Sequence, residues 1–351
     1  MVSLFGTKTA GWVGVDIGSS SVKLVSLSQQ GENYQIDSYA IVSLPPAAVV
    51  DGSVEIQTAV SEAIERGLTV CGSRLKHAIV AVPSSAVITK RLEISSAFTE
   101  LELAEQVEIE ADQFIPYALD EVALDFEVVG PSANDPNLNE ILLIACRRED
   151  VSAREDAVNA TPLRCEIVDV DTFAIERLLP LLAPFDAEQL VGLVDIGAAT
   201  LTLNVFRDGK IIYNREQAFG GNELAHAIHQ QYGLEFVEIE QKMRIGELDK
   251  EIMDLLVMPF RQSVCQQVSR ALQFFYSSGA QSQLSVLYLA GGVSCIEGLA
   301  AMMQDEVGVP ARVANPFENM RVGSRLNQNR LMKDAPMLVK ACGLAMRSFD
   351  R

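Results

Sequence analysis

The sequence contains few of the residues from which metal clusters and disulfide frameworks are built. Its 351 residues include three histidines and six cysteines, and no two cysteines form a CxxC pair. The cysteines lie far apart, mostly within apolar strings such as ILLIACRR and LVKACGLAM. Neither a zinc knuckle nor a disulfide framework is therefore indicated, and we expect a reducing environment.

Long apolar runs are also missing. The longest apolar stretches, such as LLPLLAPF and LSVLYLAGG, are much shorter than the roughly 20 residues that a membrane helix needs. The first residues, MVSLFGTKTAGW, lack the apolar core of a signal peptide. We therefore expect a cytoplasmic protein without direct membrane insertion, which reaches a membrane only through a partner.

Basic residues are scarce relative to acidic ones. There are 28 Lys and Arg against 47 Asp and Glu, which gives a net charge of −19. An acidic surface repels phosphate backbones, so we do not expect nucleic acid as a partner. The segment between Arg91 and Arg147 contains 13 of the acidic residues and neither lysine nor arginine. This acidic segment is either a solvated face or a surface that recruits a basic partner segment.

A short internal repeat is the most informative feature of the chain. Residues 13–18 read VGVDIG and residues 192–197 read GLVDIG. Each copy is followed by small or hydroxyl residues, a second apolar strand, a glycine-containing turn, a third strand and a helical pattern. Alternating apolar residues around such turns are typical of hairpins. Each half of the chain is therefore predicted to begin with three antiparallel strands.

The tight turns of the repeat have the composition of phosphate-binding loops. Gly18 and Gly197 let the backbone approach a ligand closely, and N–H groups exposed by the small residues that follow can bind an anion. Asp16 and Asp195, at strand ends, could hold Mg²⁺ through its water ligands. Two such turns facing each other would bind a polyphosphate from both sides. The stretch LSVLYLAGGVSCIEGL (284–299) adds a strand, a glycine pair and a helix start that suit a phosphate or a planar ring.

These motifs resemble those of the actin, Hsp70 and sugar-kinase superfamily. VGVDIGSSSVKLV resembles its first phosphate motif, LVDIGAATLTLNV its second and YLAGGVSCIEGL its adenosine motif. Over nearly its whole length the chain is similar to the PilM family of type IV pilus assembly proteins, which is related to FtsA. Stretches that carry this similarity include VAVPSSAVITKRLEI, IEADQFIPYALDEVALDFEV, FGGNELAHAI, QVSRALQFFYSSG and CGLAMRSFD.

The resemblance implies an α/β, actin-like ATPase fold of two lobes, ribonuclease-H-like and duplicated, with an FtsA-type α+β subdomain inserted in the first lobe. Residues 1–84, 166–187 and 325–351 would form the first lobe, residues 85–165 the acidic insert and residues 188–324 the second lobe. The insert reads independently as strand, helix, strand, strand and helix. A capping box, Thr99 with Glu102, predicts the start of its first helix.

The resemblance also implies ATP or ADP with Mg²⁺ between the lobes. The residues expected at this nucleotide follow the motifs: Asp16, Gly18, Ser19, Ser20, Ser21 and Lys23; Asp195, Gly197, Ala198, Ala199 and Thr200; Gly220 and Gly221; Glu240 and Lys242; Gly291, Gly292, Val293 and Ser294. Strand alternation could instead turn Lys23 outward, and Glu240 with Lys242 could be an ordinary solvated pair.

Hydrolysis is a separate question. Relatives that hydrolyse ATP carry a Glu or Gln that positions the attacking water in the segment joining the lobes. The nearest aligned carboxylate here is Asp169, which is one methylene shorter. We therefore expect nucleotide binding with slow or absent ATP hydrolysis.

The family resemblance implies docking of the cytoplasmic N-terminal segment of the inner-membrane protein PilN, together with other pilus platform proteins. The chain would then lie in the cytoplasm, peripheral to the inner membrane through that partner. Candidate groove residues lie in VPSSAVITK (82–90) and in QFIPYAL (113–119), where Ile115 and Tyr117 could equally belong to the core. The alternative function is a small-molecule, sugar-type kinase of the same superfamily.

Overall fold

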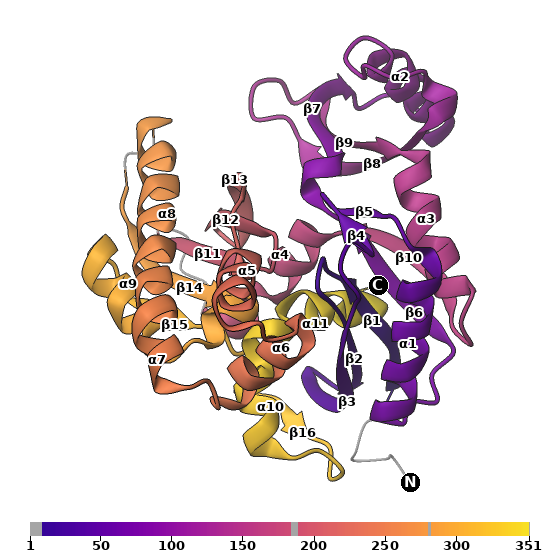
Figure 1. The fold of residues 1–351 in the computed structure, drawn as a ribbon. Helices are drawn as coiled ribbons and strands as arrows, with labels where there is room; N and C mark the ends of the chain where they lie inside the picture. Colours follow the sequence, from indigo (N-terminus) through magenta and orange to yellow (C-terminus); the bar gives the residue numbers. More distant parts are fainter. Residues whose placement is uncertain (1–8, 184–188, 280–281, 351) are drawn as a thin grey trace, which may run out of the picture.

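The computed structural model describes residues 9–183, 189–279 and 282–350 (Figure 1). The first of its two large sheets lies in the first lobe. The predicted boundary at residues 187 and 188, and the predicted start at residues 1–8, fall outside the described residues. The sheet has six strands, in the order β10 (Arg164–Val170), β6 (His77–Val82), β1 (Thr9–Ile17), β2 (Ser21–Gln30), β3 (Asn33–Ser43) and β16 (Arg321–Val322).

The second large sheet repeats the order of the first. Its strands run β13 (Lys210–Ala218), β12 (Thr200–Arg207), β11 (Leu190–Ile196), β14 (Leu284–Ala290) and β15 (Ala311–Val313). In both sheets the first three strands in sequence are antiparallel neighbours, and the fourth strand, β6 or β14, pairs parallel to the first. The internal repeat therefore folds twice into the same unit, as predicted.

A small three-stranded sheet forms the insert at the far end of the first lobe (Figure 1). Its strands lie in the order β7 (Val87–Ser95), β9 (Leu138–Arg147) and β8 (Val122–Pro131), with α2 (Glu100–Ala111) on one side and α3 (Arg148–Asn159) following β9. The predicted capping box is present, since the Thr99 hydroxyl and the Glu102 carboxylate each accept from the other residue's backbone N–H. The predicted order of strand, helix, strand, strand and helix is confirmed.

Two lobe boundaries in the structure differ from the predicted ones. Helix α3 packs on α1 (Gln57–Cys71), β6 and β10, and its buried Ala157 and Val158 belong to the core of the first lobe. The helix was assigned to the insert, but its apolar side faces the large sheet. Strand β16 was assigned to the second lobe, and it pairs instead with β3.

The second lobe surrounds its sheet with helices. The core includes Val264 and Val268 of α8, packed with Leu203 and Leu287 of the sheet. The helices of this lobe are α5 (Gly221–Tyr232), α6 (Phe236–Ile245), α7 (Lys250–Ile252), α8 (Met258–Ser277) and α9 (Leu299–Val307). In the first lobe, the two-stranded ribbon β4 (Val49–Val50) and β5 (Ser53–Val54) precedes α1.

Between the two large sheets lie α4 (Asp171–Leu182), α10 (Gln328–Asp334) and α11 (Val339–Met346) (Figure 1). One core cluster joins these helices to both sheets, through residues such as Leu27, Leu178, Leu193 and Val339. Helix α11 lies against β1 and α4. A Cβ atom at Gly14 would overlap the carbonyl of Ala341, and one at Gly343 would overlap that of Ala174. Because glycine has no side chain, α11 can approach β1 and α4 this closely.

Among residues 9–183, 189–279 and 282–350, every helix is too short or too polar to cross a bilayer.

Candidate functional site

The two repeated turns have the same hydrogen-bonded geometry. The Gly18 N–H donates to the Ser21 carbonyl at 3.1 Å, and the Gly197 N–H donates to the Thr200 carbonyl at 2.9 Å. The first turn contains Ser19 and Ser20, and the second contains Ala198 and Ala199. Each turn leads directly from the strand that carries an aspartate, Asp16 or Asp195, into the next strand.

Two glycine pairs converge on the second turn. The Gly221 N–H donates to the Gly197 carbonyl at 3.0 Å, and a Cβ at Gly220 would lie 2.5 Å from the Ala198 carbonyl oxygen. Gly291 has a φ of +84°, and a Cβ there would lie 2.6 Å from the Asp195 carboxylate. Only glycine permits these approaches. The start of α5 and the end of β14 are thereby held at the second turn.

The remaining residues of the third motif support this arrangement. Gly292 opens a short 3₁₀ turn that ends at Cys295. The Ser294 hydroxyl, which is buried, donates to the Gly291 carbonyl at 2.6 Å. The Val293 side chain is buried and faces Gly221. Val293 and Ser294 therefore position the backbone of this motif.

Both turn aspartates are paired with lysines. Lys23 Nζ lies 3.3 Å from Asp16 Oδ2, so strand alternation does not turn this lysine away from the turn. Lys340 Nζ, on α11, lies 2.8 Å from Asp195 Oδ2 and 3.1 Å from Asp171 Oδ2. Asp171 is the first residue of α4, and its other oxygen accepts from the Ser84 N–H at 2.9 Å. Three carboxylates and two ammonium groups therefore gather where the lobes meet.

Neighbouring carboxylates keep the Lys340 side chain protonated. Burial alone would lower the pKa of its ammonium group, but Asp195, Asp171 and Asp16 outweigh that cost and raise the pKa well above the usual value. The Lys340 side chain is 19% exposed, and those of Asp171 and Asp195 are 11% and 14% exposed. The group is therefore cationic at any physiological pH.

Helix α6 presents one of its two predicted residues to the other lobe. The Ser43 hydroxyl, at the end of β3, donates to Glu240 Oε2 at 2.6 Å. Lys242 instead pairs with Glu238 of the same helix at 3.0 Å. The structure thus gives Glu240 a position across the lobes and gives Lys242 the surface pair that was the alternative.

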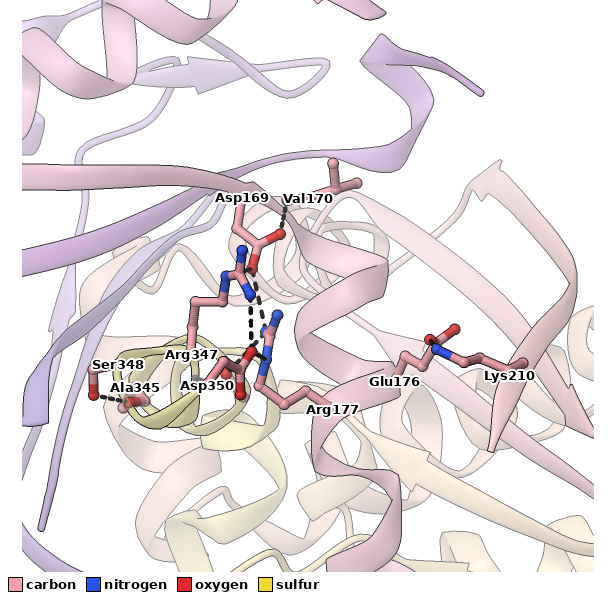
Figure 2. Close-up of polar contacts among 10 residues, drawn as sticks. Asp169, Val170, Glu176, Arg177, Lys210, Ala345, Arg347, Ser348 and Asp350 are labelled. Atoms are coloured by element: carbon pink, nitrogen blue, oxygen red, sulfur yellow. Dashed lines mark hydrogen bonds and ion pairs between the residues drawn. The ribbon is translucent and has the colours of Figure 1, made fainter. Parts of the chain in front are cut away.

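Asp169 does not join the lysine and carboxylate cluster. Its Oδ2 lies 3.2 Å from Arg177 Nη1 and 3.9 Å from Arg347 Nε, and its Oδ1 accepts from the Val170 N–H (Figure 2). Arg177 also pairs with Asp350 at 2.7 Å. These contacts tie β10 and α4 to the C-terminal turn. Both carboxylate oxygens of Asp169 serve this structural network, and its catalytic role stays a prediction.

Asp171 and Lys340 were missed by the sequence interpretation. Asp171 lies two residues after Asp169, but the strand ends at Val170 and the helix begins, so the two carboxylates leave the chain in different directions. The signal for Lys340 was a single charge inside the apolar string MLVKACGLAM. A lone lysine in a buried helix calls for a carboxylate partner.

A groove of about 320 Å³ lies between the insert, the start of α4 and the edge of the second sheet. Its lining includes the apolar Val87, Phe173 and Ile212 and the polar Thr89 and Asn214. Ile115 is 7% exposed in the core of the insert, and Tyr117 is exposed beneath the Arg147 guanidinium. Neither lines the groove. The other predicted stretch, 82–90, supplies Ser84, Val87 and Thr89.

Two sheets that share the order of five strands, joined through a shared helical core, with a duplicated glycine turn where the lobes meet, define an actin-like ATPase fold. The model of the family described as type IV pilus assembly protein PilM matches residues 14–349, and the chain belongs to this family.

Solved structures agree with this assignment. The structure described as the PilM-PilN type IV pilus biogenesis complex matches with a TM-score of 0.79 and 27% identity, over 97% of this chain and 99% of that chain. The ethanolamine utilization protein EutJ from Carboxydothermus hydrogenoformans matches with a TM-score of 0.55 and 17% identity, over 97% of this chain and 89% of that chain. The second likeness concerns the fold alone.

Proposed function

We propose that this protein is a nucleotide-binding, actin-like scaffold of the type IV pilus assembly platform, and that it docks the cytoplasmic N-terminal segment of PilN. The observation that carries the proposal is a similarity to a chain of a PilM–PilN complex that extends over nearly the whole of both chains. Membership of the PilM family argues against the alternative, a small-molecule kinase. The protein would reach the inner membrane through PilN.

The groove beside the insert is the docking site that we propose. Strand β7 is the outer strand of its sheet and β13 is the outer strand of the second sheet, so each has one edge without a neighbouring strand within the described sheets. Both contribute to the groove lining. An extended peptide can pair with such an edge through main-chain hydrogen bonds while its side chains enter apolar pockets. Val87, Phe173 and Ile212 supply the apolar surface.

A binding titration tests this site. The probe is a fluorescent peptide with the N-terminal residues of the PilN from the same organism. We expect Thr89→Trp and Ile212→Asp to weaken binding about tenfold or more. The tryptophan would fill part of the groove, and the aspartate would place a charge on its apolar surface, where binding would desolvate it. Tyr117→Ala and Ile109→Asp are controls, since both residues are exposed on the insert and neither lines the groove. Equal affinities for all four variants would remove the groove from the proposal.

The acidic insert gives the association a second measurable property. If its carboxylates recruit a basic segment, the association rate falls as salt increases, while the dissociation rate changes little. Stopped-flow mixing at increasing salt measures both rates. A salt-independent association rate would make the acidic segment a solvated face only.

We also propose that the nucleotide turns over slowly or not at all. Asp169 is bound to two arginines and Asp171 to Lys340, so neither is free to position an attacking water. A phosphate-release assay should give a rate below about 1 s⁻¹, the low end of typical enzyme rates. A faster rate would contradict this part of the proposal.

A further inference from the structure

Lys340 is the feature that the proposed function does not explain. It is the one charged residue of α11, a helix that otherwise buries Val339, Ala341, Cys342 and Leu344. The glycine contacts at Gly14 and Gly343 seat this helix directly on the first sheet and on α4. The ammonium therefore lies beside Asp195 of β11 and Asp171, the first residue of α4.

The contacts of this ammonium are those of an internal counter-ion. Two of its three N–H donors are used by Asp195 and Asp171, at 2.8 and 3.1 Å. Asp16 is already paired with Lys23 at 3.3 Å. Each aspartate of the two phosphate turns therefore has its own cation, and both cations belong to the chain itself.

This arrangement does not fit a magnesium site. Mg²⁺ requires oxygen ligands in octahedral geometry and is held in nucleotide sites by one or two carboxylates, directly or through water. Here the ammonium of Lys340 lies within hydrogen-bond distance of Asp195, the predicted magnesium residue of the second turn, and would repel a dication beside it. Among the described residues, no group of three or more His, Cys, Asp or Glu side chains could hold a metal ion.

We propose that Lys340 takes the place of the divalent cation, so that the cleft binds a nucleoside di- or triphosphate without Mg²⁺. This inference rests on the proposed nucleotide-binding function. The ammonium keeps one N–H donor for a phosphate oxygen, and lysine binds phosphate well as a point charge. Lys23, at the first turn, supplies a second positive charge.

The test compares nucleotide affinity with and without metal. Purified protein, freed of nucleotide, is titrated with fluorescent ATP and ADP analogues, once in EDTA and once with saturating MgCl₂. For the unmodified protein we expect the two dissociation constants to agree within about threefold. For Lys340→Met, which keeps the length of the side chain and removes its charge, we expect binding in EDTA to weaken at least about tenfold relative to MgCl₂, a coupling common between neighbouring sites.

Two further variants keep the result interpretable. Lys340→Met combined with Asp171→Asn removes one charge of each sign, and it should fold even where the single variant is unstable while still requiring Mg²⁺ for tight binding. Lys250→Met, at an exposed lysine of α7, should behave like the unmodified protein. Thermal unfolding of each variant reports whether it is folded.

Each outcome decides the question. Binding by the unmodified protein only in MgCl₂ would overturn the inference and leave the nucleotide site standing. Metal-independent binding by the folded double variant would also overturn it. The lack of any nucleotide binding under both conditions would overturn the inference together with the nucleotide-binding part of the proposed function, whereas PilN peptide binding would remain a separate measurement.

Discussion

The hydroxyl of Ser43 donates a hydrogen bond of 2.6 Å to the carboxylate of Glu240 and thereby connects the first lobe to the second. Ser43 ends β3, and Glu240 lies on α6. The contact spans 197 positions of sequence and lies on the side where the adenosine is expected. Opening of the lobes must break it.

We predict that Ser43→Ala speeds the release of bound nucleotide. A hydrogen bond to a charged group contributes about 1.5–3 kcal/mol, so loss of this contact should raise the dissociation rate roughly tenfold to a hundredfold. Displacement of a fluorescent ADP analogue in a stopped-flow instrument measures the rate. Glu238→Ala is the matched control on the same helix, because Glu238 pairs only with Lys242 among the contacts described here. Identical rates in Ser43→Ala and the unmodified protein would mean that the contact does not restrain the lobes.

A second contact between the lobes should matter chiefly for stability. Arg244 of α6 donates two hydrogen bonds, at 2.9 and 2.6 Å, to the buried Asp334, which also accepts from the Tyr39 hydroxyl. Arg244→Met leaves this carboxylate without its main partner, and we expect a loss of about 3 kcal/mol in the free energy of unfolding. Arg330→Ala removes an arginine that is 69% exposed and 3.7 Å from the same carboxylate, and it should cost less than about 1 kcal/mol. Urea denaturation distinguishes the two, and equal losses would contradict the assignment.

A pair of glycine substitutions tests the backbone contacts at the second phosphate turn. Gly291 and Gly308 both have positive φ, at +84° and +68°, but only Gly291 is crowded, by Ile196 and Asp195. Gly308→Ala should cost about 1–2 kcal/mol from backbone strain alone. Gly291→Ala should cost more than that and also weaken nucleotide binding. Thermal unfolding and nucleotide titration check both effects, and similar behaviour of the two variants would be evidence against a packed turn.

Substitution of two neighbouring aspartates separates structure from ligand binding. Asp169→Asn weakens the ion pairs with Arg177 and Arg347 and should lower stability by about 1–3 kcal/mol while nucleotide affinity stays unchanged. Asp171→Asn frees Lys340 from one of its two carboxylates and should change nucleotide affinity. Isothermal titration of both variants gives the comparison. A loss of nucleotide binding in Asp169→Asn, but not in Asp171→Asn, would restore the role first predicted for Asp169.

The sequence was sufficient for the parts of the molecule that depend on local pattern. The duplicated turns, the hairpins that follow them and the order of elements in the insert all follow from alternation, glycine and capping residues. The backbone around Gly18, Gly197 and Gly291 favours glycine at these positions, so the motifs that contain them can be recognised in the sequence.

The charge arrangement at the site could not be predicted in the same way. Lys340 reaches Asp195 through the packing of α11 between the sheets, and no local pattern encodes that approach. Asp171 was missed because its position depends on the residue at which a strand becomes a helix, and such boundaries are uncertain by a residue or two in any sequence interpretation. For Ile115 both the groove and the core were left open, because the sequence pattern of an apolar side chain near a surface turn is the same in either place, and the residue lies in the core of the insert.

The position of α11 also affects how the protein is made. Ribosomes synthesise all the strands of both large sheets before α10 and α11, yet these helices complete the core that the sheets share. The insert, whose strands lie close together in sequence, can fold while synthesis continues. The junction of the lobes cannot, and until Lys340 emerges Asp171 and Asp195 lack the ammonium group that pairs with them in the folded protein. We therefore expect the nascent protein to carry an exposed apolar and acidic surface until late in translation.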